Sequence, residues 1–321
     1  MNPYIGHTSQ LCCVEEVRLV GGKGDGMRLL QVRNATGLEM TICADRCADI
    51  YRLIFQGQNM GYFSPSGYVS PCYYDDKGNG FLKSFTAGFL TTCGLTAVGA
   101  PCMDEGEELP LHGTIGNTPC ERIWWEEDDE NIYVRAFIND SALFARKLYL
   151  KRTIVIGKNE NRFTIKDTIE NQGDIQSPAM IMYHMNIGYP LLSENTVVGI
   201  PSVSVKPRNK HAAKDLSACC KMLPPTAGFE EQCYFHSFAT EGKASVYNPD
   251  IRKGLTISFD PNTLDHFTEW KMMGYRDYVL GLEPGNCNPD GRDVMRQNGM
   301  LKFLDPGECR TYEVNVTLFE K

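Results

Sequence analysis

Apolar and polar residues alternate one by one along several stretches of the chain. In residues 161–171, Phe163, Ile165 and Ile169 share one side, while the residues between them are mostly polar. The same period of two recurs in three further stretches: 131–139, 254–260 and 312–319. This alternation is typical of β-strands that bury one face. We therefore predict half-buried strands in all four stretches.

Short groups of turn-forming residues separate these strands. Groups rich in Gly, Asn, Asp and Pro occur at four places: 157–161, 171–174, 248–254 and 305–308. Such residues favour tight turns. Long amphipathic helices are missing, and only residues 211–222 are predicted to form a short helix. Many short strands with few helices indicate an all-β sandwich. Since no linker or repeat divides the chain, we predict a single domain over residues 1–321.

The chain is acidic, with a formal net charge of −8 over 321 residues. This charge argues against binding to nucleic acid or to anionic membranes. The densest basic run, at 206–210, is predicted to be a solvated loop. The N-terminus lacks the features of a signal peptide, and no apolar run approaches the length of a transmembrane helix. We therefore expect a cytoplasmic protein without a nucleic-acid or membrane partner.

Cysteine is abundant, with 13 residues, but no C-x-x-C pair occurs. Without a secretory signal, reduced thiols are the default state. The neighbours Cys219 and Cys220, like the other close pairs, lack the spacing of a structural zinc site. Most of the cysteines are predicted to be small buried hydrophobic residues. We expect no metal and no cofactor, with a zinc site among the cysteines as the alternative.

Four stretches place polar side chains among apolar ones: 42–53, 109–120, 181–192 and 269–292. In the first, Arg46 stands between Asp45 and Asp49. It either forms an internal ion pair at a turn or offers its donors to an oxyanion or a sugar hydroxyl. In the second, His112 precedes Gly113. Glycine allows a ligand to approach the backbone closely, although a lone histidine is more often structural.

The third and fourth stretches carry the residues best suited to proton transfer. His184 and Asn186 are two positions apart, so on a strand they share one face. Glu283 ends an apolar strand just before a Pro-Gly pair. A carboxylate at the end of a buried strand is costly unless it is paired or used. Lys271 and Arg292 are possible partners, which is the structural explanation for Glu283.

Together these stretches supply two histidines, one carboxylate and several cations next to glycines. This set suits acid–base chemistry on a polar small molecule. Motifs of dinucleotide-binding folds, P-loops, serine hydrolases and zinc proteases are missing from the sequence. Those classes are therefore excluded.

The order of three motifs resembles that of the aldose 1-epimerase, or galactose mutarotase-like, superfamily. The motifs are LHG at 111–113, YHMNIGYPLL at 183–192 and YVLGLEPGN at 278–286. The chain looks closest to a poorly characterised branch once classed as a domain of unknown function. That likeness extends to four more segments: 44–50, 112–117, 269–274 and 288–292. It therefore covers nearly the whole chain.

The resemblance implies a large β-supersandwich and a sugar site. In the superfamily, a histidine after an apolar strand is the general acid and a glutamate near the C-terminus is the general base. By resemblance, His184 is the acid, Glu283 is the base, and His112 binds substrate. Four further residues are expected to bind substrate: Arg46, Asn186, Lys271 and Arg292. The expected partner is a small sugar or sugar derivative, and the expected assembly is a monomer or a homodimer.

The chain departs from the well-studied mutarotases around the acid. They show Asn-His followed by Tyr-Phe-Asn, whereas this chain has Tyr183-His184-Met185-Asn186. Their sugar specificity is therefore not transferred. The hypothesis is mutarotation by a carboxylate base, Glu283, and an imidazolium acid, His184. Their ordinary pKa values, near 4.3 for glutamate and 6.5 for histidine, suit these roles without large shifts.

Three other functions remain open. The first is sugar binding without catalysis, and the second is isomerisation at a carbon beside the carbonyl. The third is glycoside hydrolysis, which usually needs two carboxylates, with Asp45 or Asp49 as the second. Trp270 is the preferred stacking surface for a sugar. Trp124 and Trp125 are expected instead at a strand edge or in the core.

Overall fold

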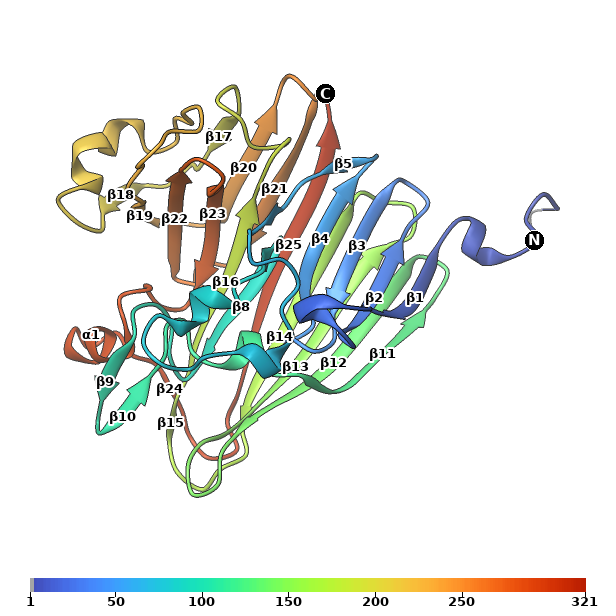
Figure 1. Cartoon of the computed structure of the whole chain (residues 1–321). Helices are drawn as coiled ribbons and strands as arrows, with labels where there is room; N and C mark the ends of the chain where they lie inside the picture. Colours follow the sequence, from blue (N-terminus) through green and yellow to red (C-terminus); the bar gives the residue numbers. More distant parts are fainter. Residues whose placement is uncertain (1–2) are drawn as a thin grey trace.

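Antiparallel sheets make up most of the protein in the computed structural model, which describes residues 3–321 (Figure 1). The largest sheet has eight strands, in the order β11 (Cys120–Glu127), β12 (Asn131–Ser141), β13 (Lys147–Gly157), β14 (Arg162–Asn171), β25 (Cys309–Glu320), β21 (Lys253–Phe259), β20 (Gly242–Asn248) and β17 (Val197–Gly199). The four stretches with a period of two coincide with β12, β14, β21 and β25. Those strand predictions are confirmed.

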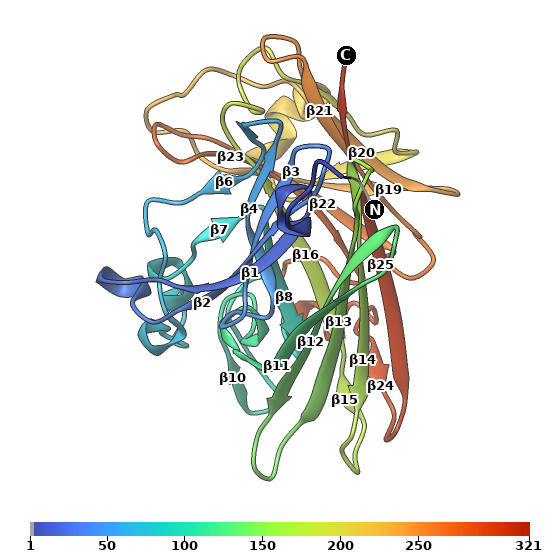
Figure 2. The ribbon, with the colours of Figure 1, turned by 90° about the vertical axis from the view of Figure 1, so that its right-hand side faces the viewer.

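Two smaller sheets pack against this large one. The five-stranded sheet contains β1 (Cys13–Arg18), β2 (Arg28–Arg33), β3 (Leu38–Cys43), β4 (Asp49–Phe55) and β5 (Gln58–Asn59). The six-stranded sheet has the order β18 (Ser204–Pro207), β19 (Gln232–Ser237), β22 (His266–Met273), β23 (Tyr278–Gly285), β16 (Met180–Ile187) and β8 (Leu90–Leu95). The side view separates β2 and β4 from the layer of β13, β14 and β25 (Figure 2).

Short pairs and helices complete the fold. Two-stranded sheets pair β9 (Cys102–Asp104) with β10 (Glu107–Leu109), β15 (Ser177–Pro178) with β24 (Phe303–Leu304), and β6 (Tyr62–Phe63) with β7 (Ala87–Gly88). The helices are α1 (Arg292–Gln297) and the 3₁₀ turns η1 (Thr8–Gln10), η2 (Gly22–Gly24), η3 (Pro71–Tyr73), η4 (Gly80–Lys83), η5 (Ile115–Asn117) and η6 (Ala212–Ala218). The helix predicted at 211–222 is therefore η6, shorter and more tightly wound than expected. In residues 3–321, every helix is too short or too polar to cross a bilayer.

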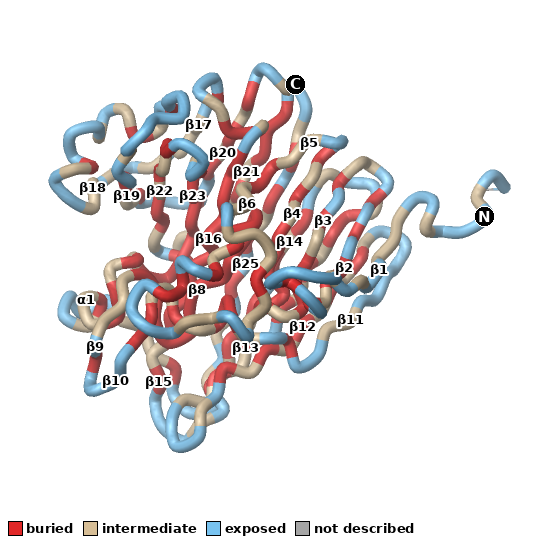
Figure 3. Tube along the Cα trace, in the orientation of Figure 1, coloured by how far each residue is buried: buried red, intermediate tan, exposed pale blue. Residues whose placement is uncertain are grey.

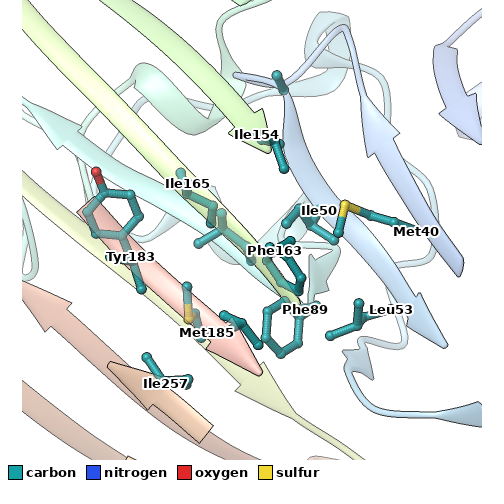
Figure 4. Close-up of a cluster of buried hydrophobic side chains, with 14 of the residues drawn as sticks. Met40, Ile50, Leu53, Phe89, Ile154, Phe163, Ile165, Tyr183, Met185 and Ile257 are labelled. Carbon is teal, nitrogen blue, oxygen red and sulfur yellow. The ribbon is translucent and has the colours of Figure 1, made fainter. Parts of the chain in front are cut away.

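The core joins all three large sheets. Buried residues follow the strands, and exposed residues gather in the connections (Figure 3). Figure 4 shows one part of the core, where side chains from the three sheets meet: Ile154 and Ile165, Ile50 and Leu53, and Tyr183 and Met185. One apolar face of the eight-stranded sheet is thus covered by the other two sheets. This arrangement confirms the predicted all-β supersandwich.

Strand β16 lies between β8 and β23 and is buried along its whole length. Its alternation sends Tyr183 and Met185 into the core, where both belong to the large apolar cluster. His184 must therefore point to the opposite face of the six-stranded sheet. That face carries the candidate site.

Candidate active site

His184 and Glu283 face each other across two neighbouring strands. The antiparallel register of β16 and β23 pairs Met182 with Gly285 and Met185 with Leu282, which places His184 opposite Glu283. Their Nε2 and Oε1 atoms are 3.2 Å apart, and both side chains are almost fully buried. A Cβ at Gly281 would collide with the Glu283 carboxylate. Glycine at position 281 therefore makes room for this carboxylate.

A cavity of about 330 Å³ opens beside this pair. Its size is at the lower end of the range for small-molecule sites, about 300–1,000 Å³. Aromatic and polar side chains share its wall: Phe81, Phe85, Trp270, His112, Arg208 and Glu231, together with His184 and Glu283. The three sequence motifs that carried the resemblance therefore meet at one cavity.

His112 approaches His184 from the loop after β10. Its backbone has a φ of 61°, which is uncommon for a residue with a side chain and concentrates at functional sites. Two backbone hydrogen bonds hold it there, from its N–H to Gly99 O and from Gly94 N–H to its carbonyl. The His112 and His184 ring centroids are 5.5 Å apart in an edge-to-face arrangement. His112 Nδ1 is buried without a protein partner, and the residue lines the cavity.

Trp270 forms a second wall of the cavity. The β22–β23 register pairs Thr268 with Glu283 and Trp270 with Gly281, so both β22 side chains point to the same face as Glu283. Trp270 packs edge-to-face on His184, with ring centroids 5.3 Å apart. Its Nε1 donates a hydrogen bond to Glu231 Oε2 over 2.8 Å. This bond fixes the orientation of the indole.

Burial changes the protonation of the pair from what the sequence suggested. It lowers the pKa of His184 to about 4, although the Asn186 side chain and a backbone group raise it in part. It raises the pKa of Glu283 well above the usual range; Glu231 adds to this rise and Arg208 opposes it. Both shifts favour the neutral form. The expectation of nearly ordinary pKa values is therefore wrong, because neither group is solvated.

His112 is driven to the neutral form as well. Burial lowers its pKa to about 3, and His184 and Arg208 lower it further. A neutral imidazole offers one donor and one acceptor, which suits a sugar hydroxyl.

Asn186 lies on the same face as His184 but outside the cavity. Its Nδ2 donates to the backbone carbonyl of His184 over 2.9 Å, and its Oδ1 has no hydrogen-bond partner. It is fully buried. The structure therefore places Asn186 behind the imidazole, where it acts on His184 rather than on a ligand.

Arg46, Lys271 and Arg292 lie away from the cavity wall. Arg46 donates to the Val69 carbonyl and to Asn117 Oδ1, and no ion pair links it to Asp45 or Asp49. Lys271 points to the other face of β22, where Nζ donates to a carbonyl over 3.2 Å. Arg292 is held by the carboxylates of β9 and β10. The geometry gives these three cations no contact with a sugar in the cavity, and neither Lys271 nor Arg292 pairs with Glu283.

The sequence did not identify two charged residues of the cavity wall, Arg208 and Glu231. Arg208 belongs to the basic run 206–210, which was interpreted as a solvated loop, yet it borders the cavity. Its Nε donates to Asp290 Oδ1 over 3.0 Å, and its Nη2 to a carbonyl over 3.1 Å. Glu231 stands in a polar loop without any motif. The local sequence does not show that either residue reaches the cavity, because the folding of the 208–231 connection brings both there.

The two other tryptophans lie where they were expected, with Trp124 and Trp125 on the edge strand β11.

Comparison with solved structures shows the same fold in proteins named as epimerases or as mutarotase-like. A Klebsiella pneumoniae protein provisionally named an aldose 1-epimerase superposes with a TM-score of 0.91 at 27% identity, over 96% of this chain and 83% of that one. A galactose mutarotase-like protein of Clostridium acetobutylicum gives 0.71 at 12% identity, over 97% and 100%. The galactose 1-epimerase of Lactobacillus acidophilus gives 0.65 at 12% identity, over 96% and 99%.

The sequence comparisons identify a family without an assigned activity. No curated protein matches the chain in sequence. A family model described as a domain of unknown function, DUF4432, matches residues 24–318. The chain therefore has the galactose mutarotase-like fold and belongs to the DUF4432 family.

Proposed function

We propose that this protein is a sugar isomerase that interconverts the anomers of a monosaccharide, an aldose 1-epimerase. The observation that carries the proposal is the pair of His184 Nε2 and Glu283 Oε1, 3.2 Å apart at a cavity of monosaccharide size. Mutarotation needs one base for the anomeric hydroxyl and one acid for the ring oxygen. This pair supplies both functions without a metal or cofactor.

The pair works through a single shared proton. With Glu283 protonated and His184 neutral, the pair carries one proton between its two groups. This state and the ion pair contain the same number of protons, so a bound sugar can shift the proton from one group to the other. In either state, one group accepts the proton of the anomeric hydroxyl while the other protonates the ring oxygen. The C–O bond then breaks, the aldehyde rotates, and the reverse transfers close the other anomer.

Two further groups hold the sugar. Trp270 stacks on an apolar face of the ring, and neutral His112 hydrogen-bonds a hydroxyl. Arg208 and Glu231 bring opposite charges, and Asp290 further offsets Arg208. Because charge is nearly balanced at this wall, a neutral sugar is favoured over a phosphorylated or acidic one.

The test is anomer exchange measured by polarimetry or by NMR saturation transfer on a panel of aldoses. Wild type is expected to accelerate exchange of at least one neutral aldose. His184→Ala and Glu283→Gln should each lower kcat about 10²–10⁴-fold, the usual contribution of a positioned acid or base. Carrying out the assay in D₂O separates the related isomerases, because proton abstraction beside the carbonyl incorporates deuterium at carbon. Sugar binding without exchange would contradict the catalytic proposal and favour a binding protein.

Glycoside hydrolysis is the second candidate, since Glu231 is another carboxylate at the cavity. Glycosidases usually need two such groups, and Glu231 is near enough to raise the pKa of Glu283. A neighbouring depression of about 440 Å³ shares Phe85, Glu231 and Trp270 with the cavity and offers room for a second sugar. Release of nitrophenol from aryl glycosides, abolished in both Glu231→Gln and Glu283→Gln, would favour this function over mutarotation.

A further inference from the structure

A second cluster of reactive side chains lies on the opposite face of β22 from the cavity. Thr268 and Trp270 border the cavity, so Glu269 between them points the other way. There it meets Cys219 and Cys220, which directly follow η6. The two Sγ atoms and one carboxylate oxygen of Glu269 lie within 4.8 Å of one another.

The spacing of the two sulfur atoms fits a tetrahedral metal ion. The Sγ atoms of Cys219 and Cys220 are 3.8 Å apart, and both cysteines are free thiols. With Zn–S bonds of about 2.3 Å, tetrahedral geometry separates two sulfur ligands by about 3.8 Å. The sulfurs are therefore already placed for one ion.

Glu269 is oriented for the same ion. The side chain is fully buried, and its Oε1 has no hydrogen-bond partner. His236 Nε2 donates to the other oxygen, Oε2, over 3.1 Å, and Ser202 contacts Nδ1 of that ring over 2.9 Å. Carboxylates that ligate a metal are themselves held by hydrogen bonds from outer partners, and His236 supplies such a bond to Glu269.

Charge in this cluster also favours a cation. Lys271 is buried on the same face, but its Nζ donates only to the Ala218 carbonyl. If Lys271 alone neutralised Glu269, Oε1 would remain a buried acceptor without a donor, which is costly. A divalent ion together with Lys271 balances two thiolates and one carboxylate.

We propose that Cys219, Cys220 and Glu269 bind a divalent ion of the zinc class, with the fourth position left to water. Thiolates with one carboxylate suit zinc, whereas magnesium and calcium prefer all-oxygen sites. The ion ties the connection 208–231 to β22. Both ends of that connection, Arg208 and Glu231, border the cavity, and β22 carries Trp270. The ion therefore holds the wall of the sugar site from behind.

The test uses the full-length protein, stripped with a chelator and kept reduced. Titration with Co²⁺ alone is expected to give the near-ultraviolet charge-transfer band of a thiolate–cobalt complex at one ion per chain, and Zn²⁺ should displace it. Cys219→Ser and Cys220→Ser should each weaken the band, and the double variant should lose it. His236→Gln should weaken binding about 10–100-fold, as outer partners do. The exposed Cys72→Ser and Cys309→Ser are the matched controls and should bind like wild type.

A second measurement covers variants that fold poorly. Zn²⁺ is expected to raise the Tm of the wild type, because a ligand that binds the folded state stabilises it. The Tm of a Cys219→Ser/Cys220→Ser variant should not respond. An absent band in the wild type, or an unchanged band in the double variant, would overturn the proposal. Neither readout uses sugar, so a failure of the mutarotase proposal leaves this result standing.

Discussion

Consecutive residues of β16, Tyr183 and His184, belong to two buried polar clusters with opposite properties. Tyr183 points into the core and donates to Asp167 over 3.0 Å. Asp167 also binds Arg152, whose five N–H groups are all used: by Asp167 twice, Asp49, Thr92 and the Cys47 carbonyl. On the other face, His184 Nδ1, Glu283 Oε1 and His112 Nδ1 have no hydrogen-bond partner.

The difference separates structure from function. A buried polar network that is fully satisfied holds a fold together and has nothing left for a ligand. A buried pair with unused atoms is costly to the fold, and under the proposed function a bound sugar supplies the missing partners. Four substitutions test this contrast, beginning with the largest effect.

Arg152→Met should destabilise the protein most. It leaves Asp49 and Asp167 buried without their cation, and breaking a buried ion pair costs about 3–5 kcal/mol. Urea denaturation measures this loss. The neighbouring Lys151→Met is the matched control, because Lys151 forms a partly exposed pair with Glu170, worth less than about 1 kcal/mol. If both variants lost the same free energy of unfolding, the buried network would stabilise the fold no more than a surface ion pair does.

Gly281→Ala should impair catalysis without altering either catalytic group. The added methyl collides with the Glu283 carboxylate, and misplacing a reacting group by about 1 Å costs roughly 10²-fold in rate. The measurement is kcat/KM for anomer exchange, together with Tm. Gly6→Ala, at an exposed glycine where the added methyl makes only an ordinary van der Waals contact, is the control. Full activity in Gly281→Ala would mean that the position of Glu283 does not matter.

Glu283→Gln should make the protein more stable at pH 7, by about 1 kcal/mol. The pKa of Glu283 is raised in the folded state, so between its unfolded value and that raised value the folded state binds more protons. Stability then falls as pH rises through this window. Glutamine is neutral throughout, so the gain is present at pH 7 and vanishes near pH 4. Denaturation across this pH range measures it, with the exposed Glu241→Gln, away from the cavity, as control. A variant less stable than wild type at pH 7 would indicate an ionised Glu283 held by His184.

Arg292→Lys should have the smallest effect on activity. Arg292 contacts Asp104 and Glu107 rather than the cavity, so kcat/KM for anomer exchange should stay roughly unchanged. Stability should fall by about 1 kcal/mol, because lysine cannot reproduce the forked contacts of arginine. A large rise in KM would restore Arg292 as a sugar ligand.

The strands and the shared face of His184 and Asn186 were accessible from the sequence for local reasons. A period of two appears wherever one face of a strand is buried, so β12, β14, β21 and β25 could be predicted residue by residue. The same period showed that His184 and Asn186 share a face. Motif order then suggested Glu283 as the partner of His184, although no spacing argument alone could join residues about a hundred positions apart.

Tertiary structure decided which charges reach the cavity. Arg46, Lys271 and Arg292 stand in motifs that resemble the family, but their side chains point to other parts of the fold. Arg208 and Glu231 lie at the two ends of the connection 208–231, which has no motif, yet both border the cavity. The direction of a loop side chain depends on packing partners remote in sequence, and local pattern contains none of that information.

The same limit applies to protonation and to the cysteines. The ordinary pKa values expected for His184 and Glu283 assumed water around them, and only the folded structure shows that water is excluded. The sequence around Cys219 and Cys220 did not indicate a zinc site. The proposed third ligand, Glu269, comes from a strand that is distant in sequence. The sequence by itself determined where strands form and which residue types stand on each face. Which faces meet, and which polar atoms are left without water or a partner, depended on long-range packing.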